Sequence, residues 1–367
     1  MTVKSVSLLK FGIFQKMLLA MLLVALVPLS IIWYIDYRST IAQTTATVDQ
    51  QLTGISDKLT AQVNDWVGMN LKALNQNAAL ADMKSMDAKR QNPILRTMTG
   101  EYQWSFLAHS MGPDGMNVGR SDDKAPIDYS DRVYFKKVMD GSAMGQQVVI
   151  SKTNNKPALL LSVPISTTDA ASGTKKVIGV LAMGMSIADI SERITNPHIG
   201  TSGFAFLLDE NGKVVAHQKQ EYADTSADFS KHPAFAGRPA EGKKQLVYDD
   251  AGKKVIAIVQ ITQPGWALVT QQNYDEAYAP IEESKLRALL ILGSTLVVVT
   301  VFAFLLSQGL TGPIRNLTRI AEDLSRGGVV MKINEVNRHD EIGALAAAID
   351  RMGVSIRLAM DRLKAKT

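Results

Sequence analysis

Two long stretches without a charged residue constrain this chain more than any other feature. Residues 17–35 (MLLAMLLVALVPLSIIWYI) and 288–306 (ALLILGSTLVVVTVFAFLL) each hold nineteen consecutive residues without Asp, Glu, Lys or Arg. Because a helix rises about 1.5 Å per residue, each run can cross the roughly 30 Å hydrocarbon core of a bilayer. The sequence therefore predicts two transmembrane helices, 17–35 and 288–310, with a large segment between them.

A cleaved signal peptide is the alternative interpretation of the first run. The run is longer than a usual signal-peptide core, and Asp36 and Arg38 follow it without a small-residue cleavage pattern. We therefore expect the run to be retained as a helix. Residues 1–16 carry three Lys and no acid, which assigns them to the cytoplasm by the positive-inside rule. Residues 36–287 are then expected outside the membrane and residues 311–364 inside.

The composition argues against several classes of function. The net charge of +5 comes from the ends, since residues 1–16 give +3, residues 311–367 give +3, and the remainder gives −1. No basic face for nucleic acid is therefore predicted. The chain has no Cys, and its five His show no metal-ligand spacing. Without a nucleophile–base pair or a phosphate loop, we expect no metal, no cofactor and no enzyme.

The segment between the two runs changes texture near Gly100. Apolar residues over 39–98 recur at steps of three and four, which indicates one long helix or a broken pair. After Gly100, short apolar runs alternate with turns, and two similar sets of these predicted strands follow each other. The turns include GPDG, DENG and DDAG, at 112–115, 209–212 and 249–252. We expect an α+β fold in which a long N-terminal helix carries two antiparallel-sheet, PAS-like units.

The run DYSDRVYF at 128–135 introduces a family resemblance. Together with Gly141, VVIS, LLLSVPI and IGVLAMGMSIADI, it resembles the double Cache (dCache) sensor domain of bacterial chemoreceptors and sensor kinases. The resemblance covers about residues 40–275 and is most specific at 128–135. It implies an inner-membrane location, a small ligand in the membrane-distal unit, and signal transmission through the membrane-proximal unit.

Arg132 is the residue of this run best suited to hold a ligand. Its planar guanidinium offers five donors that match a carboxylate, while Tyr134 and Phe135 add flat walls. The residues alone leave open a structural ion pair between Arg132 and Asp128 or Asp131. The resemblance favours ligand contact.

Neighbouring residues complete the predicted site. Ser130 or Asp131 can cap a short helix, which would place Arg132 in its first turn. His109 and Asn154 are weaker candidates for the pocket. The remaining predicted ligand-binding residues are Tyr129, Asp131 and Trp104.

Gly184 departs from the pattern of amino-acid-binding relatives. The resemblance implies an aspartate at this position for the ligand ammonium, and Gly184 offers no such charge. We therefore predict an organic anion as ligand in preference to an amino acid.

The segment after the second run carries two heptad seams. Residues 311–328 and 340–363 place apolar residues at alternating steps of three and four, which need partner helices to bury them. Two such helices from each of two chains would form a parallel four-helix bundle, so we expect a homodimer. An antiparallel hairpin within one chain is the alternative.

These motifs resemble the HAMP domain, a cytoplasmic helical bundle that relays signals. The resemblance rests on Pro313-Ile314-Arg315, Gly327-Gly328 and Asp340-Glu341-Ile342-Gly343, with Val330 and Ile333 as connector anchors. The residues predicted to relay the signal are Pro313, Arg315, Asp340, Glu341, Gly343, Ile349 and Ile356.

No methylation helix, kinase, phosphatase or cyclase follows Leu363 in this sequence. We expect the output partner to be a separate kinase, phosphatase, cyclase or chemoreceptor. Two alternatives stay open: a truncated or degenerate chemoreceptor, and a membrane-anchored solute-binding module without signalling.

Overall fold

The computed structural model describes residues 12–168, 174–326 and 332–364. The chain divides into two compact units, Gln43–Ala279 and a second formed by Met1–Ala42 with Pro280–Thr367. Gly327, Gly328 and Val330, which belong to the predicted HAMP connector, lie outside the described residues.

Three helices precede the first sheet. Helix α1 runs from Ile13 to Ala78, α2 from Ala81 to Lys84, and α3 from Ala88 to Glu101. The predicted transmembrane run and the first part of the 39–98 pattern therefore belong to one uninterrupted helix. Asp87 begins α3 because its side chain accepts a hydrogen bond from the Lys89 N–H.

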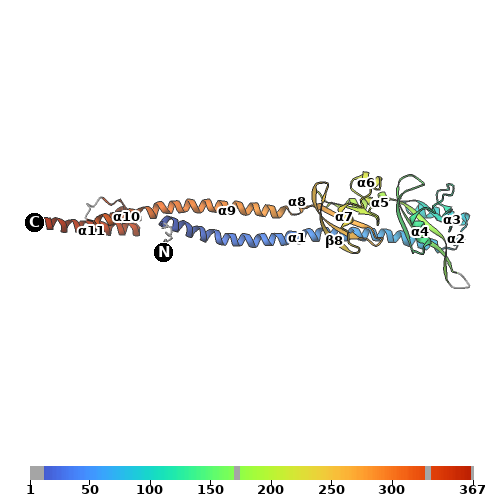
Figure 1. The fold of residues 1–367 in the computed structure, drawn as a ribbon, viewed down its shortest axis with the longest axis horizontal. Coiled ribbons are helices and arrows are strands. Elements are labelled where there is room, and N and C mark those ends of the chain that lie inside the picture. Colours follow the sequence, from blue (N-terminus) through green and yellow to red (C-terminus); the bar gives the residue numbers. More distant parts are fainter. Residues whose placement is uncertain (1–11, 169–173, 327–331, 365–367) are drawn as a thin grey trace, which may run out of the picture. The chain divides into compact units, whose positions relative to one another are not determined.

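Two five-stranded antiparallel sheets follow, which confirms the predicted α+β architecture (Figure 1). The first has the order β2-β1-β5-β4-β3 and the second the order β7-β6-β10-β9-β8. The strands of the first sheet are β1 Ser105–Met111, β2 Asn117–Arg120, β3 Gly145–Ile150, β4 Pro157–Thr168 and β5 Lys175–Ser186. Those of the second are β6 Phe204–Leu208, β7 Val214–Ala216, β8 Lys243–Asp250, β9 Lys253–Ile261 and β10 Ala267–Asn273.

Short helices connect the strands. In the first sheet α4 (Val133–Met139) lies between β2 and β3. The others are α5 Ile187–Thr195, α6 Gln220–Asp224, α7 Pro233–Ala236 and α8 Tyr274–Ala277.

Helix α1 carries both sheets. Val48 and Leu52, nearer to the apolar run, pack with Ile256 and Ile258 of the second sheet. Residues further along α1, from Leu59 onward, pack on the first sheet. We call the first sheet with α2–α4 the distal unit, and the second with α5–α8 the proximal unit, by this distance along α1.

The opposite face of each sheet has its own core. In the distal unit Tyr129, Tyr134 and Phe135 pack over Leu160 and Ala182. In the proximal unit Phe206, Phe235 and Val269 form the corresponding cluster. Each sheet is thus covered on both sides, with α1 on one face and the segment around α4 or α7 on the other.

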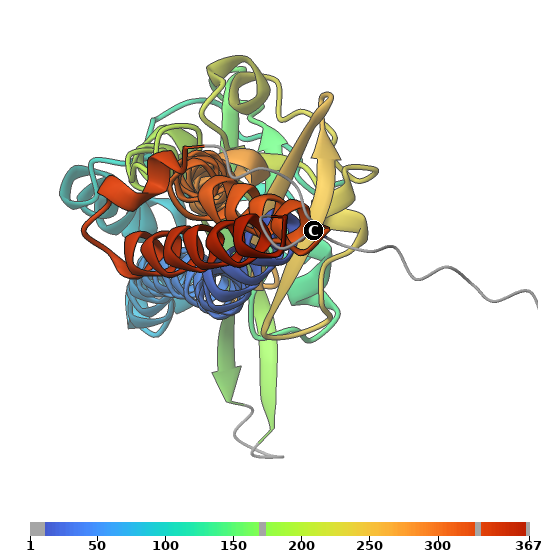
Figure 2. The same cartoon turned by 90° about the vertical axis from the view of Figure 1, so that its left-hand side faces the viewer.

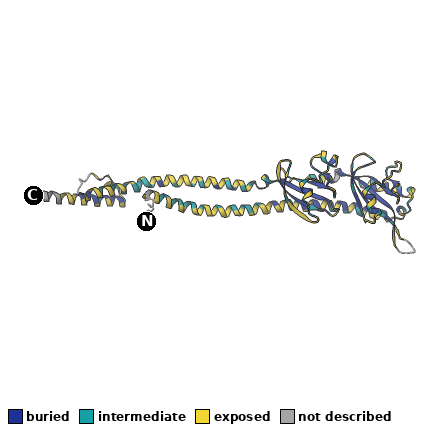
Figure 3. Ribbon diagram, in the orientation of Figure 1, coloured by how far each residue is buried: buried dark blue, intermediate teal, exposed yellow. Residues whose placement is uncertain are grey.

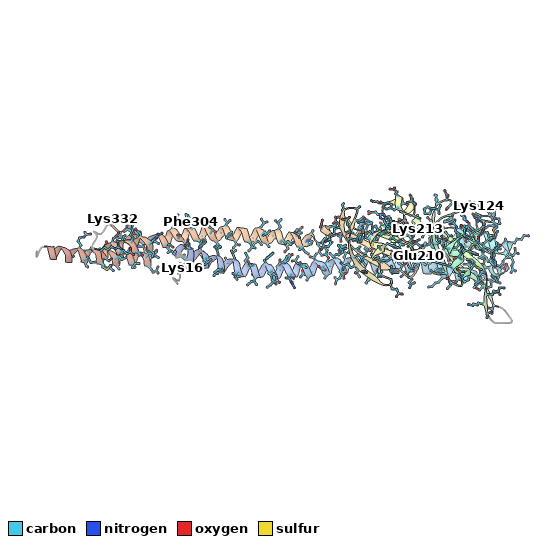
Figure 4. All side chains as sticks on the ribbon, viewed as in Figure 1. Lys16, Lys124, Glu210, Lys213, Phe304 and Lys332 are labelled. Atoms are coloured by element: carbon cyan, nitrogen blue, oxygen red, sulfur yellow. The ribbon has the colours of Figure 1, made fainter. Side chains whose placement is uncertain are left out.

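Glu210, in the turn after β6, joins the proximal unit to the distal unit (Figure 4). Its Oε1 lies 3.0 Å from the Lys137 Nζ of α4, and its Oε2 accepts a 3.1 Å hydrogen bond from Gln146 Nε2 of β3. Gln146 also donates to the Pro264 carbonyl at 2.5 Å.

Two helices are long and apolar enough to cross a membrane, the first part of α1 and α9 (Ala279–Leu306). Their apolar side chains are largely exposed, as the colouring in Figure 3 shows; Leu289, for example, is 67% exposed. Surfaces of this kind need lipid or a partner to cover them. Helix α9 continues through a π-helical segment, Ser307–Thr311.

Two further helices follow this segment, α10 (Gly312–Ser325) and α11 (Glu341–Lys364). They lie side by side (Figures 1 and 2), and Leu317 of α10 packs with Ile342, Ala346 and Ile349 of α11. Ile333 of the connector is buried in the same cluster.

Candidate functional site

Arg132 directly precedes α4, at the end of the segment that connects β2 to this helix. Its side chain is 15% exposed, and its Nε is 3.9 Å from Asp131 Oδ1. Asp131 makes a closer contact, 2.8 Å, with Lys152 Nζ. Among the described residues, no hydrogen bond is made by the Arg132 guanidinium. The Arg132 nitrogens are not among the buried atoms that have no hydrogen-bond partner, so they reach solvent and are available to an anion that enters the site.

The start of α4 differs from the prediction. Arg132 is the residue that precedes the helix, not part of its first turn, and neither Ser130 nor Asp131 caps it. The Val133 N–H instead donates to Gln147 Oε1 of β3, at 2.9 Å. The acceptor thus comes from a strand that local sequence gives no means to identify.

Three buried rings lie next to each other on this face of the sheet. The rings of His109 and Tyr129 have centroids 4.8 Å apart, and Tyr134 Oη lies 3.4 Å from His109 Nε2. His109 Nδ1 is buried and has no hydrogen-bond partner in the part of the chain that the structure describes. Burial, followed by the charge of Arg120, lowers the pKa of His109 to about 3. Neutral His109 therefore presents polar atoms to this cluster without adding charge.

Arg120 at the end of β2 is the residue that sequence reasoning missed. Its side chain is 3% exposed and forms a two-bond contact with Asp122, each bond 2.8 Å. It also donates to Asn117 Oδ1 at 2.8 Å and lies 3.4 Å from Tyr129 Oη and from Thr153 Oγ1. A buried guanidinium with four such partners fixes the positions of Tyr129 and the loop behind it.

The remaining predicted residues separate into two groups. Tyr129, Tyr134 and Phe135 are buried together on the α4 side of the distal sheet. Trp104 packs instead with the cluster between the sheet and α1, where its Nε1 donates to Asn70 Oδ1 at 3.0 Å. The structure therefore does not place Trp104 beside Arg132.

Gly184 lies on β5 under the same cluster. A Cβ at this position would be 3.0 Å from Phe106 Cζ and 3.2 Å from Leu160 Cδ1. Apolar groups thus occupy the space that a longer side chain would need. No acidic side chain from this position reaches the cluster.

The predicted relay residues lie in and around α10 and α11. Asp340 caps α11, because its Oδ1 accepts from the Gly343 N–H at 3.0 Å, and its bond with Arg338 lowers its pKa to about 2. Gly343 needs to be glycine, since a Cβ would lie 2.0 Å from the Arg338 carbonyl oxygen. Pro313 stands at the start of α10, and Arg315 and Glu341 are exposed.

Ile349 and Ile356 differ in their surroundings. Ile349 is buried against α10, whereas Ile356 is 37% exposed, together with Met352 and Leu345 of the same helix. The described residues contain no group of three or more His, Asp or Glu placed to hold a metal ion.

Family models match most of the chain. A Cache domain model matches residues 37–281, and a HAMP domain model matches residues 305–358. The fold and the two apolar helices thus define a chain with the domain plan of a membrane chemoreceptor. Since the Cache match covers more than half of the sequence, the chain belongs to the Cache domain family, as the DYSDRVYF run predicts.

Curated relatives are chemotaxis proteins. Methyl-accepting chemotaxis protein McpA of Bacillus subtilis is 22% identical over 362 residues, which cover 94% of this chain and 51% of McpA. PscA of Pseudomonas syringae is 23% identical over 368 residues, 94% of this chain and 55% of PscA. The chain thus spans about half the length of these relatives.

Solved structures share the fold of the compact unit Gln43–Ala279. The ligand-binding domain of Pseudomonas fluorescens chemoreceptor CtaA, in complex with L-isoleucine, has a TM-score of 0.52 at 13% identity and covers 65% of this chain and 97% of its own. The ligand-binding domain of the Pseudomonas aeruginosa amino-acid chemoreceptor PctB, in complex with L-Arg, has a TM-score of 0.50 at 15% identity, with 63% and 98% covered.

Proposed function

We propose that this chain is a transmembrane receptor that binds a small organic anion outside the membrane, in the distal unit. The observation that carries the proposal is the Arg132 guanidinium, which is 15% exposed and makes one long ion-pair contact, 3.9 Å to Asp131, but no hydrogen bond to described residues. In this proposal residues 1–16 and 311–364 are cytoplasmic, residues 17–35 and 288–310 span the inner membrane, and residues 36–287 sense the ligand.

An amino acid is the second candidate ligand. Its support is that CtaA and PctB carry amino acids in their solved complexes. Against it, a ligand ammonium needs an acidic partner, and Gly184 lies against Phe106 and Leu160 where that partner is expected. Asp131 is largely exposed and already paired with Lys152. We therefore favour a carboxylate without an amino group.

Calorimetry on the full chain in detergent tests the choice of ligand. We expect one or more small mono- or dicarboxylates to bind, and the Arg132→Ala variant to bind them at least tenfold more weakly, because a charge-assisted pair is lost. Arg96→Ala is the matched control, since Arg96 is an exposed arginine of the same unit paired with Asp123.

Two results would contradict the proposal. Tight binding of α-amino acids with no response to carboxylates would establish the second candidate. Equal carboxylate affinity in Arg132→Ala and Arg96→Ala would remove Arg132 from the site.

For the relay, we propose that α10 and α11 pack against their counterparts in a second copy of the chain. The exposed apolar residues Met352 and Ile356 support this pairing, because a heptad seam is stable only when a partner covers it. Ligand binding would shift the population between two packings of this bundle. A separate kinase, phosphatase, cyclase or chemoreceptor would receive the signal.

Glutamate substitutions separate relay from binding. We expect Ile349→Glu with Ile356→Glu to abolish the cellular response to ligand while calorimetry shows unchanged affinity. Ala348→Glu, on an exposed position of the same helix, is the control. A full response from the double variant would favour a membrane-anchored binding module without signalling.

A further inference from the structure

The two units repeat one turn, bond for bond. In the distal unit the Tyr129 N–H donates to the Gly115 carbonyl and the Ser130 N–H to Asp128 Oδ1, at 3.0 and 2.8 Å. In the proximal unit the same two bonds join Phe229 to Gly212 and Ser230 to Asp228, each 2.8 Å. Both glycines have positive φ, and a Cβ would overlap Ser130 at Gly115 and Ser230 at Gly212.

This repeat assigns a proximal counterpart to each residue of the distal site. DYSDRVYF at 128–135 matches DFSKHPAF at 228–235, so His232 stands where Arg132 stands, each directly before its helix. Counting from the paired glycines, the last residue of β2, Arg120, corresponds to His217, just after β7. Gln271 corresponds to Gly184. Gln271 pairs with Phe204 and Gly184 pairs with Leu107, and Phe204 and Leu107 stand at the same distance before the paired glycines.

The proximal counterpart surrounds a cavity. Its volume is about 460 Å³, within the range of roughly 300–1,000 Å³ typical of small-molecule sites. The rings of Phe204, Phe206, Tyr222 and Phe229 line it, with His217 and His232 among them. Ala234 replaces Tyr134 of the distal unit, which leaves the proximal cluster with less side-chain volume.

His217 directs a donor into this space. It is 6% exposed, and its Nδ1 accepts from the Lys219 N–H at 2.9 Å. The proton of the neutral ring is therefore on Nε2, which makes no hydrogen bond with the described residues. Burial, followed by the charge of Lys219, lowers the pKa of His217 to about 4, which keeps the ring neutral at physiological pH.

The charged groups of the lining favour a negative ligand. Lys219 and Lys253 line the cavity, and neither has an acidic partner among the described residues. The acidic residue, Asp250, is already engaged: Gln271 Nε2 donates to it at 2.8 Å, and His232 Nε2 is 3.7 Å away. The groups of the lining that remain available to a ligand are thus the His217 donor and two solvent-exposed lysines, beside aromatic rings.

We propose that the proximal unit holds a second ligand site, specific for a small carboxylate with a flat apolar body. The carboxylate accepts from His217 Nε2 and pairs with Lys219 and Lys253. The body lies against the aromatic rings that line the cavity, Phe204, Phe206 and Phe229. This site stands on its own cavity and does not depend on the ligand assigned to Arg132.

The test uses the full chain in detergent with the Arg132→Ala substitution, so that the distal site is disabled. Benzoate, phenylacetate and 3-phenylpropionate are titrated by calorimetry, with benzylamine as the cationic comparison. We expect at least one carboxylate to bind, benzylamine not to bind, and His217→Phe to weaken carboxylate binding about tenfold.

Lysine variants keep the test independent of folding. Lys253 is on the surface, and Lys253→Met should weaken binding several-fold. Lys254 is its neighbour, with its Nζ 4.0 Å from the Tyr274 ring centroid, and Lys254→Met should not weaken binding. Thermal unfolding without ligand checks that each variant is folded.

The proposal is overturned if none of the carboxylates binds, if benzylamine binds in their place, or if folded His217→Phe and Lys253→Met bind as tightly as their parent. Failure of the distal site has a different signature. It appears as equal carboxylate binding by the wild-type chain and Arg132→Ala, and it leaves the His217 and Lys253 effects intact.

Discussion

The distal and proximal units have the same strand order and the same glycine–serine turn, but their interiors differ. In the distal unit Arg120 bonds Asp122 and Asn117, and Tyr134 is buried in the apolar cluster on the sheet. At the matching positions the proximal unit has His217 and Ala234, and His217 lines a cavity together with several aromatic rings. Backbone bonds therefore preserve the frame, while the side chains at its centre differ between the two units.

The largest expected effect tests the distal network. Arg120→Leu should destabilise the compact unit Gln43–Ala279 by about 3 kcal/mol, because Asp122 and Asn117 lose a buried partner. His217→Leu, the matching change in the proximal unit, should cost only about 1 kcal/mol, the value of one neutral hydrogen bond. Thermal unfolding followed by circular dichroism measures both. Equal losses would show that the two interiors are not held differently.

A pH series gives the next largest effect. His109 has its pKa lowered to about 3, while an unfolded His titrates near 6.5, so below about pH 6.5 the unfolded state binds more protons. Stability should therefore fall as pH falls, by up to about 1.4 kcal/mol per pH unit. His109→Phe, which copies Phe206 of the proximal unit, should remove that part of the slope.

The same series sharpens the comparison of the two units. Between pH 6.5 and 5.0, the dependence of the free energy of unfolding on pH should also become weaker in His217→Phe, because the folded pKa of His217 is about 4. His198→Gln, at an exposed position, is the control. An unchanged slope in His109→Phe would mean that His109 is not held neutral by the fold.

The smallest effect concerns the contact between the units. Glu210→Gln removes the ion pair with Lys137 and should cost less than about 1 kcal/mol, since both groups are partly exposed. Its informative readout is cooperativity: hydrogen exchange should show the two sheets opening more independently. Glu241→Gln, at an exposed position, should leave exchange as it is. No difference between the variants would show that Glu210 does not couple the units.

Sequence pattern predicts the architecture well where it is local. The charge-free runs, the heptad seams and the two sets of short strands all appear where expected, because periodicity and turn residues are read from neighbouring positions. Arg132, Tyr129, Tyr134 and Phe135 belong to one contiguous run. Their grouping in the structure follows from that local sequence.

Long-range contacts account for what the sequence does not reveal. Trp104 lies on the α1 side of the distal sheet, and an irregular register between Ser105 and Leu107 breaks the alternation that would have assigned its face. Arg120 becomes central only through the pairing of β1 with β2 and the fold of its loop. One signal was available: the Asp, Ser and Phe shared by 128–135 and 228–235 mark the repeat that locates the second cavity.

The π-helical segment Ser307–Thr311 has a consequence for how α9 and α10 are joined. A wide turn holds an extra residue, so the helix after it is rotated about the common axis without any break in the chain. The face of α10 that carries the seam is thus rotated relative to the apolar side chains of α9. Loss or gain of that one extra residue in the turn would rotate α10 about its axis, with little displacement of α9.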